Sequence, residues 1–100
     1  MMQKSTLVSR IEIPPTALVS HGSWGSTPIG TAPSTMELHK IQEGRYYIEW
    51  DIPDIQTTEN IGIWVDSDGE LTDYDGVFSL PAEAVKLLRD NNIKVSHDFE

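Results

Sequence analysis

The stretch from Ile61 to Val95 constrains the fold most, because strand, turn and helix signals follow one another there without a gap. Every second residue from Ile61 to Val65 is aliphatic, which is the period of a strand whose two faces have different surroundings. The Asp-Ser-Asp-Gly sequence at 66–69 then predicts a tight turn, since its carboxylates can accept backbone hydrogen bonds and its glycine can take a positive φ. A second strand over residues 70–74 should therefore pair back on the first.

A helix is predicted from Pro81 to about Asn91. Proline is tolerated in the first turn of a helix, where its missing amide would have had no partner. The pair Asn91-Asn92 supplies a residue that accepts the left-handed conformation at a helix end, and Ile93 can then fold back as a hydrophobic cap. Residues 77–80 are predicted to be a short strand or an extended lead-in. The apolar residues that share one side of the helix are Ala84, Val85, Leu87 and Leu88.

An earlier hairpin is predicted from strands at 36–41 and 46–52, joined by a short loop that contains glycine. Alternation in the second of these strands gives it one apolar face and one acidic face. Pro53 should end the strand, and residues 54–60 should form a polar connection. The apolar face carries Tyr46, Ile48, Trp50 and Ile52, and the other face carries Tyr47, Glu49 and Asp51.

The N-terminal third gives weaker signals. Alternating residues predict a strand over 7–13, closed by two prolines. From Ser20 to Thr35, twelve of sixteen residues are Ser, Thr, Gly or Pro, which predicts a long loop without an element of its own. We therefore expect residues 1–20 to be an N-terminal strand or arm, 21–35 a loop, and 36–100 the core of a single domain.

Two hairpins and one amphipathic helix together predict an α+β fold. An antiparallel sheet of four to five strands, two hairpins plus a possible N-terminal strand, should pack on one C-terminal α-helix, because the apolar stripe of the helix needs a sheet face to cover. The expected core residues are Ile48, Trp50, Ile61, Ile63 and Val65. The opposite face should carry Tyr47, Glu49, Asp51 and Trp64.

The net charge of −9 is concentrated in one third of the chain. Ten acidic residues and a single basic one, Arg45, lie between Glu43 and Asp75. No Lys or Arg occurs from Tyr46 to Val85, which argues against binding of a nucleic-acid backbone and favours a basic protein partner. The absence of cysteine and of any long apolar run leads us to expect a cytoplasmic protein without membrane contact.

The acidic residues of the second hairpin are candidate metal ligands. Asp-Ser-Asp-Gly-Glu at 66–70 resembles the start of a calcium loop, but its glycine comes early and the downstream Glu is missing. A solvated hairpin turn accounts for the same residues, so we expect no metal and no cofactor. The weak metal candidates are Asp66, Asp68, Glu70, Asp73 and Asp75.

No catalytic residue is predicted. The three histidines, His21, His39 and His97, lie in separate segments without the spacing of a zinc site. The chain also lacks phosphate-binding glycine loops and a nucleophile elbow.

A non-enzymatic protein-binding module of adaptor or inhibitor type is the function that the charge pattern favours. Burial in the core is the usual role of large aromatic residues such as Tyr47 and Trp64, and contact with a partner is the alternative. A small metal-dependent enzyme that uses the Asp66–Asp75 carboxylates, and a subunit that self-associates, are the other hypotheses. The residues expected to bind a partner are Tyr47, Glu49, Asp51, Trp64 and Trp24.

Overall fold

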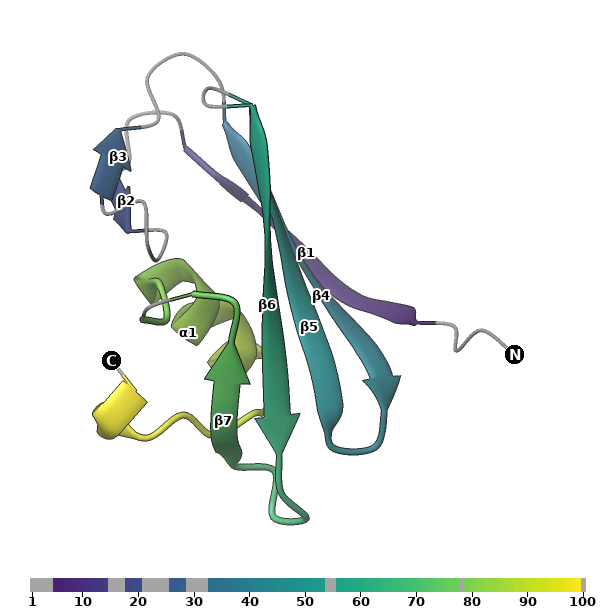
Figure 1. Ribbon diagram of the computed structural model, residues 1–100. Coiled ribbons are helices and arrows are strands. Elements are labelled where there is room, and N and C mark those ends of the chain that lie inside the picture. The colour runs from purple at the N-terminus through teal and green to yellow at the C-terminus, as the bar shows by residue number, and fades with distance from the viewer. Residues whose placement is uncertain are drawn as a thin grey trace.

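The computed structural model describes residues 5–14, 18–20, 26–28, 33–53, 56–77 and 79–99. Seven strands, one α-helix and a short 3-10 helix are found in these ranges (Figure 1). In chain order they are β1 (Thr6–Ile13), β2 (Leu18–Ser20), β3 (Ser26–Pro28), β4 (Ser34–Gln42), β5 (Arg45–Ile52), β6 (Thr57–Val65), β7 (Leu71–Asp75), α1 (Ala82–Asp90) and η3 (His97–Phe99).

Five of the strands form one antiparallel sheet in the order β1-β4-β5-β6-β7. The sheet lies beside the single α-helix of the described residues, so the predicted α+β fold is confirmed. Both predicted hairpins are present. The β4–β5 turn uses Gly44 at φ +79°, and a side chain there would meet the carbonyl oxygen of Val65 at 2.9 Å. The β6–β7 turn uses Gly69 at φ +80°.

Three irregularities in strand pairing gather at the end of the sheet where these two hairpins turn. The register shifts between Leu7 and Ser9 in β1, between Lys40 and Gln42 in β4, and where Val65 of β6 meets β7. Each shift leaves one residue without an opposite partner, which is a β-bulge. The other end of the sheet, where β4 begins and β5 ends, is paired in regular succession.

Helix α1 begins and ends as the sequence predicts. Pro81 precedes it in an extended conformation with ψ 149°, and the carbonyl of Pro81 accepts the first helical hydrogen bond from the amide of Val85 at 3.1 Å. Asn92 takes φ +67°, and the amide of Ile93 then donates to the carbonyl of Leu88 at 3.0 Å. Ile93 is buried, so it caps the helix end as expected.

The chain after α1 returns to the free side of β7. The amide of Leu71 donates to the carbonyl of Lys94 at 2.8 Å, and the amide of Lys94 donates to the carbonyl of Gly69 at 2.8 Å. These two bonds form a parallel bridge between Glu70 and Lys94. The beginning of the β7 edge is therefore covered by the C-terminal segment, which removes unpaired backbone groups from that edge.

The hydrophobic core lies between α1 and one face of the sheet. Trp50 is fully buried there, and its Nε1 donates a 3.0 Å hydrogen bond to Oγ of Ser34, which is also fully buried. This bond satisfies the one polar group of a ring that is otherwise apolar. Of the expected core residues, Val65 is only partly buried. The buried apolar residues of the sheet are Ile13, Met36, Leu38, Ile48, Trp50, Ile52, Ile61, Ile63 and Leu71.

Three boundaries differ from those predicted. The expectation that residues 20–35 form no element was wrong, because residues 26–28 pair with 18–20 and β4 already begins at Ser34. Strand β6 begins at Thr57 rather than Ile61; its first four residues are Thr, Thr, Glu and Asn, so the apolar alternation that marks a strand is missing there. Of residues 77 and 79–80, none is in a strand.

We expect Leu88→Ala to lower the free energy of unfolding by about 2 to 5 kcal/mol, because Leu88 is fully buried under the helix and its removal leaves a cavity. The exposed turn residue Ser67 provides the control, and Ser67→Ala should stay within about 0.5 kcal/mol of wild type. Urea unfolding followed by circular dichroism measures both. Equal stability of the two variants would contradict the packing of α1 on the sheet.

Two glycines at positive φ should respond differently to alanine. Gly69 and Gly76 have φ of +80° and +92°, so alanine brings a similar backbone strain of about 1 to 2 kcal/mol at each. A side chain at Gly76 would also overlap the carbonyl oxygen of Asn60, whereas at Gly69 the nearest atom lies 3.8 Å away. Gly76→Ala should therefore be less stable than Gly69→Ala by about 1 to 3 kcal/mol in the same unfolding assay. If Gly76→Ala loses less stability than Gly69→Ala, the close approach of Gly76 to the carbonyl oxygen of Asn60 is wrong.

Candidate functional site

The face of the sheet opposite α1 is here called the open face, because none of the described elements packs on it. Strand pairing sets its side chains in rows across the sheet. One row is formed by Glu12, Thr35, Asp51 and Thr58, and the next by Arg10, Glu37, Glu49 and Asn60. The following rows contain His39, Tyr47, Gly62 and Asp75, and then Arg45, Trp64 and Asp73.

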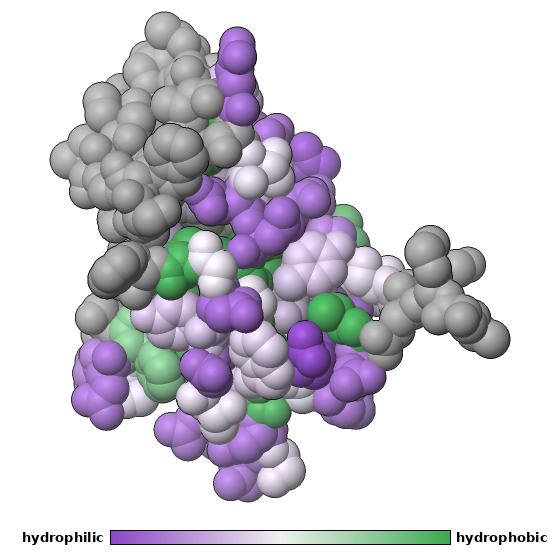
Figure 2. Space-filling view, in the orientation of Figure 1, coloured by the Kyte–Doolittle hydropathy of each residue, from purple (hydrophilic) through white to green (hydrophobic). Residues whose placement is uncertain are grey.

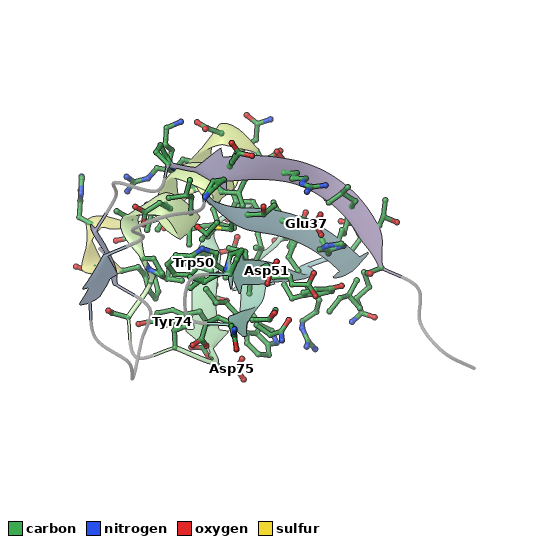
Figure 3. All side chains as sticks on the ribbon, turned by 90° about the horizontal axis from the view of Figure 1, so that it is seen from above. Glu37, Trp50, Asp51, Tyr74 and Asp75 are labelled. Carbon is green, nitrogen blue, oxygen red and sulfur yellow. The ribbon has the colours of Figure 1, made fainter. Side chains whose placement is uncertain are left out.

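Carboxylates outnumber cations on the open face. Figure 3 shows Glu37, Asp51 and Asp75 on the side of the sheet away from the helix, whereas Trp50 and Tyr74 lie on the helix side. Six carboxylates stand against two guanidinium groups, those of Arg10 and Arg45. The six are Glu12, Glu37, Glu49, Asp51, Asp73 and Asp75. Figure 2 shows mostly hydrophilic residues along the visible part of the strands.

A shallow polar depression lies where the first two rows meet. It has a volume of about 360 Å³. Inside it, the Thr58 hydroxyl donates a 3.3 Å hydrogen bond to Oδ1 of Asp51. Its lining residues are Arg10, Thr35, Glu37, Glu49, Asp51 and Thr58. A depression lined by three carboxylates can accept several hydrogen bonds from a cationic group.

Two like charges face each other in this depression. Glu37 and Glu49 are directly opposite residues of β4 and β5, an arrangement that destabilises a sheet when both are ionised. Two neighbours of Glu37 offset the repulsion. Nε of Arg10 lies 3.8 Å from its Oε2, and Nε2 of His39 lies 2.9 Å from its Oε1. The side chain of Arg10 is 64% exposed, so its ion pair contributes little.

Metal-ligating atoms converge at the same place. One atom each from Glu37, His39 and Glu49 lies within 4.8 Å of the other two. This is the single group of three such residues that the described part of the chain contains. The weak metal candidates at 66–75 form no such group in that part. Asp66 instead holds its turn, with Oδ1 accepting hydrogen bonds from the amides of Asp68 and Glu70 at 2.9 and 3.0 Å.

Aromatic rings occupy the other half of the open face. The rings of His39 and Tyr47 stack with centroids 4.7 Å apart and an interplanar angle of 4°. The guanidinium of Arg45 lies 4.5 Å from the centroid of the Trp64 ring. Gly62 makes room for the Asp75 carboxylate and for this ring, since a side chain at that position would overlap the carboxylate and lie 3.1 Å from Trp64. Both aromatic residues therefore contact neighbours on the same face.

The structure brings four of the five residues predicted to bind a partner onto one surface. Tyr47, Glu49, Asp51 and Trp64 all lie on the open face. Burial of Tyr47 and Trp64 in the core was the wrong interpretation, because both lie on the opposite side of the sheet from α1 and are only partly buried. Trp24 lies outside the described residues.

Sequence reasoning missed Glu37 and His39 as neighbours. The spacing typical of a zinc site on a helix does not apply to His39, because it lies in a strand, where residues two apart share a face. Glu37 and His39 have that spacing. A search at strand spacing along 34–42 would have found the pair.

A third cation near the hairpin turn does not offset the charge of the open face. Nζ of Lys40 donates a 2.7 Å hydrogen bond to Oε1 of Glu43. This bond lowers the pKa of the Glu43 carboxyl and raises the pKa of Lys40. Lys40 lies opposite Tyr46 on the helix side of the sheet. The charge of Lys40 is thus neutralised by Glu43, and Lys40 itself lies on the face opposite the open face.

No helix in the described ranges combines the length and the apolar character needed to cross a membrane. Comparison of the chain with protein-family models, with curated proteins and with solved structures finds no match.

Proposed function

We propose that this chain is a small non-enzymatic binding module of adaptor or inhibitor type whose open face docks a basic protein surface. The observation that carries the proposal is the excess of six carboxylates over two guanidinium groups on one face. Both of those cations have contacts within the face, Arg10 with Glu37 and Arg45 with the Trp64 ring. The remaining carboxylates repel one another, and a positively charged partner would relieve that repulsion.

The arrangement of polar and aromatic groups fits arginine better than lysine. A guanidinium has five donors in a planar fork, which matches the carboxylates of Glu49 and Asp51 around the depression. The same group stacks well on aromatic rings, and Tyr47 lies in the row next to the depression and Trp64 in the row after it. Aromatic residues are enriched at protein interfaces, and the rims of such interfaces are polar. We therefore expect the partner to present arginine residues.

The absence of cysteine supports a cytoplasmic location as part of the same proposal, because intracellular thiols are kept reduced and disulfides are rare there.

Two other functions are separated from this one by simple measurements. An enzyme that uses the carboxylates of residues 66–75 is not favoured, because in the described residues they do not gather as metal ligands. Self-association through β1 remains an alternative, since β1 pairs with β4 alone among the described strands and exposes Leu7 and Val8. Size-exclusion chromatography at several protein concentrations would reveal it.

We expect the full chain to bind a short oligo-arginine peptide more weakly when three acids of the open face are neutralised. In the variant Asp51→Asn/Asp73→Asn/Asp75→Asn, each lost pairing is worth a few tenths of a kcal/mol to about 1 kcal/mol at an exposed site. The sum is about 1.4 kcal/mol, which is roughly a tenfold loss of affinity. Fluorescence anisotropy of the labelled peptide, in a buffer with chelator, measures it.

The matched control changes the same net charge away from the open face. Asp68, Asp90 and Asp98 are also exposed aspartates, so Asp68→Asn/Asp90→Asn/Asp98→Asn should change the affinity by less than about threefold. Raising the salt should weaken wild type more than the open-face variant. Equal losses in the two triple variants would mean that the peptide senses net charge alone, and the docking proposal would then be wrong.

A further inference from the structure

We infer that Glu37, His39 and Glu49 form a binding site for a divalent transition metal, with Zn²⁺ the best match. The site does not depend on the proposed docking of a basic protein, since it uses a different ligand and can be tested without a partner. It lies inside the sheet, on the adjacent strands β4 and β5, neither of which is an edge strand. Sites on paired strands are positioned more rigidly than sites on loops.

The backbone places the three side chains without any loop. Glu37 and Glu49 are directly opposite each other, and His39 follows Glu37 by two residues on the same face. One ligating atom of each residue lies within 4.8 Å of the others. A tetrahedral zinc ion with ligands at about 2.0 to 2.1 Å needs donor atoms about 3.3 Å apart. Rotation of the glutamate side chains can close this gap, and the contact between His39 and Glu37 is already 2.9 Å.

The types of ligating atom in the three residues determine which metals the site would bind. An imidazole nitrogen with two carboxylates suits zinc and related transition metals, whereas Mg²⁺ and Ca²⁺ take oxygen ligands. The two carboxylates also supply the negative charge that a divalent cation neutralises, and a cation between them would remove the cross-strand repulsion of Glu37 and Glu49. The exposed Arg10 offsets this repulsion only from 3.8 Å.

The neighbours of the three ligands favour binding as well. His39 stacks flat on Tyr47, which fixes the plane of the imidazole, and ligands that are oriented in advance bind metals more tightly. The polar depression beside Glu37 and Glu49 leaves one side of the site accessible to solvent. A zinc ion held by three protein ligands would keep its fourth position for water or an exchangeable ligand.

Calorimetric titration of the chelator-stripped full chain with ZnCl₂, without any peptide, tests the site. We expect one zinc ion per chain in wild type, and MgCl₂ in excess should not compete. Glu49→Gln and His39→Gln each remove one ligand with little change in volume, and each should weaken zinc binding by at least about tenfold. Glu12→Gln alters the same face two rows from His39, and His21→Gln/His97→Gln removes the other histidines. Both controls should keep the wild-type affinity.

A second measurement covers the case in which His39→Gln fails to fold. Co²⁺ bound in place of Zn²⁺ should give the visible absorption of a four-coordinate site in wild type and lose most of it in Glu49→Gln. The inference would be overturned by zinc affinity that is unchanged in Glu49→Gln, by loss of binding in the His21/His97 control, or by equal competition from Mg²⁺. Failure of this test leaves peptide binding in chelator unaffected, so the two proposals fail separately.

Discussion

Burial of Trp50 decides which way every side chain of the sheet points. The ring is fully buried in the core and its nitrogen is bonded to Ser34, so neither end of the side chain can be placed in solvent without loss. Because side chains alternate along a strand, Glu49 and Asp51 must then face away from the core. The antiparallel register passes this orientation to β4 and β6 and from them to the edges. The acidic character of the open face is therefore a consequence of packing on its other side.

The open face concentrates charge that the fold itself does not neutralise. Glu37 is the best compensated of its carboxylates, with Arg10 and His39 beside it, whereas Asp51 is bonded to a neutral threonine hydroxyl. Repulsion of this kind lowers the stability of an isolated domain and is relieved by any cation that binds. The proposed guanidinium ligand would use the depression and the aromatic rings, and the proposed metal ion would use the convergence at His39.

The periodicity of the sequence was sufficient to predict the helix, both hairpins and the separation of apolar from acidic faces. It was not sufficient to pair Glu37 with Glu49, because that pairing depends on the bulge between Lys40 and Gln42. Without the extra residue, the register set at the hairpin turn would place Glu37 opposite Trp50. The alternation of apolar and polar residues shows which side chains share a face. The bulge in β4 determines which of them lie opposite each other on β4 and β5. The polar start of β6 at Thr57 was missed for a related reason, since nothing apolar marks it.

The position of the three bulges indicates where the strands can gain a residue without reversing the two faces of the sheet. A single residue added to a strand reverses the faces of everything beyond it unless it is looped out as a bulge. This sheet has accommodated three such residues, all at the end where the hairpins turn. A residue added near that end can be looped out as a further bulge, and the two faces of the sheet then stay as they are. At the opposite end, where Thr35 and Asp51 are paired regularly, one added residue would bring carboxylates into the core.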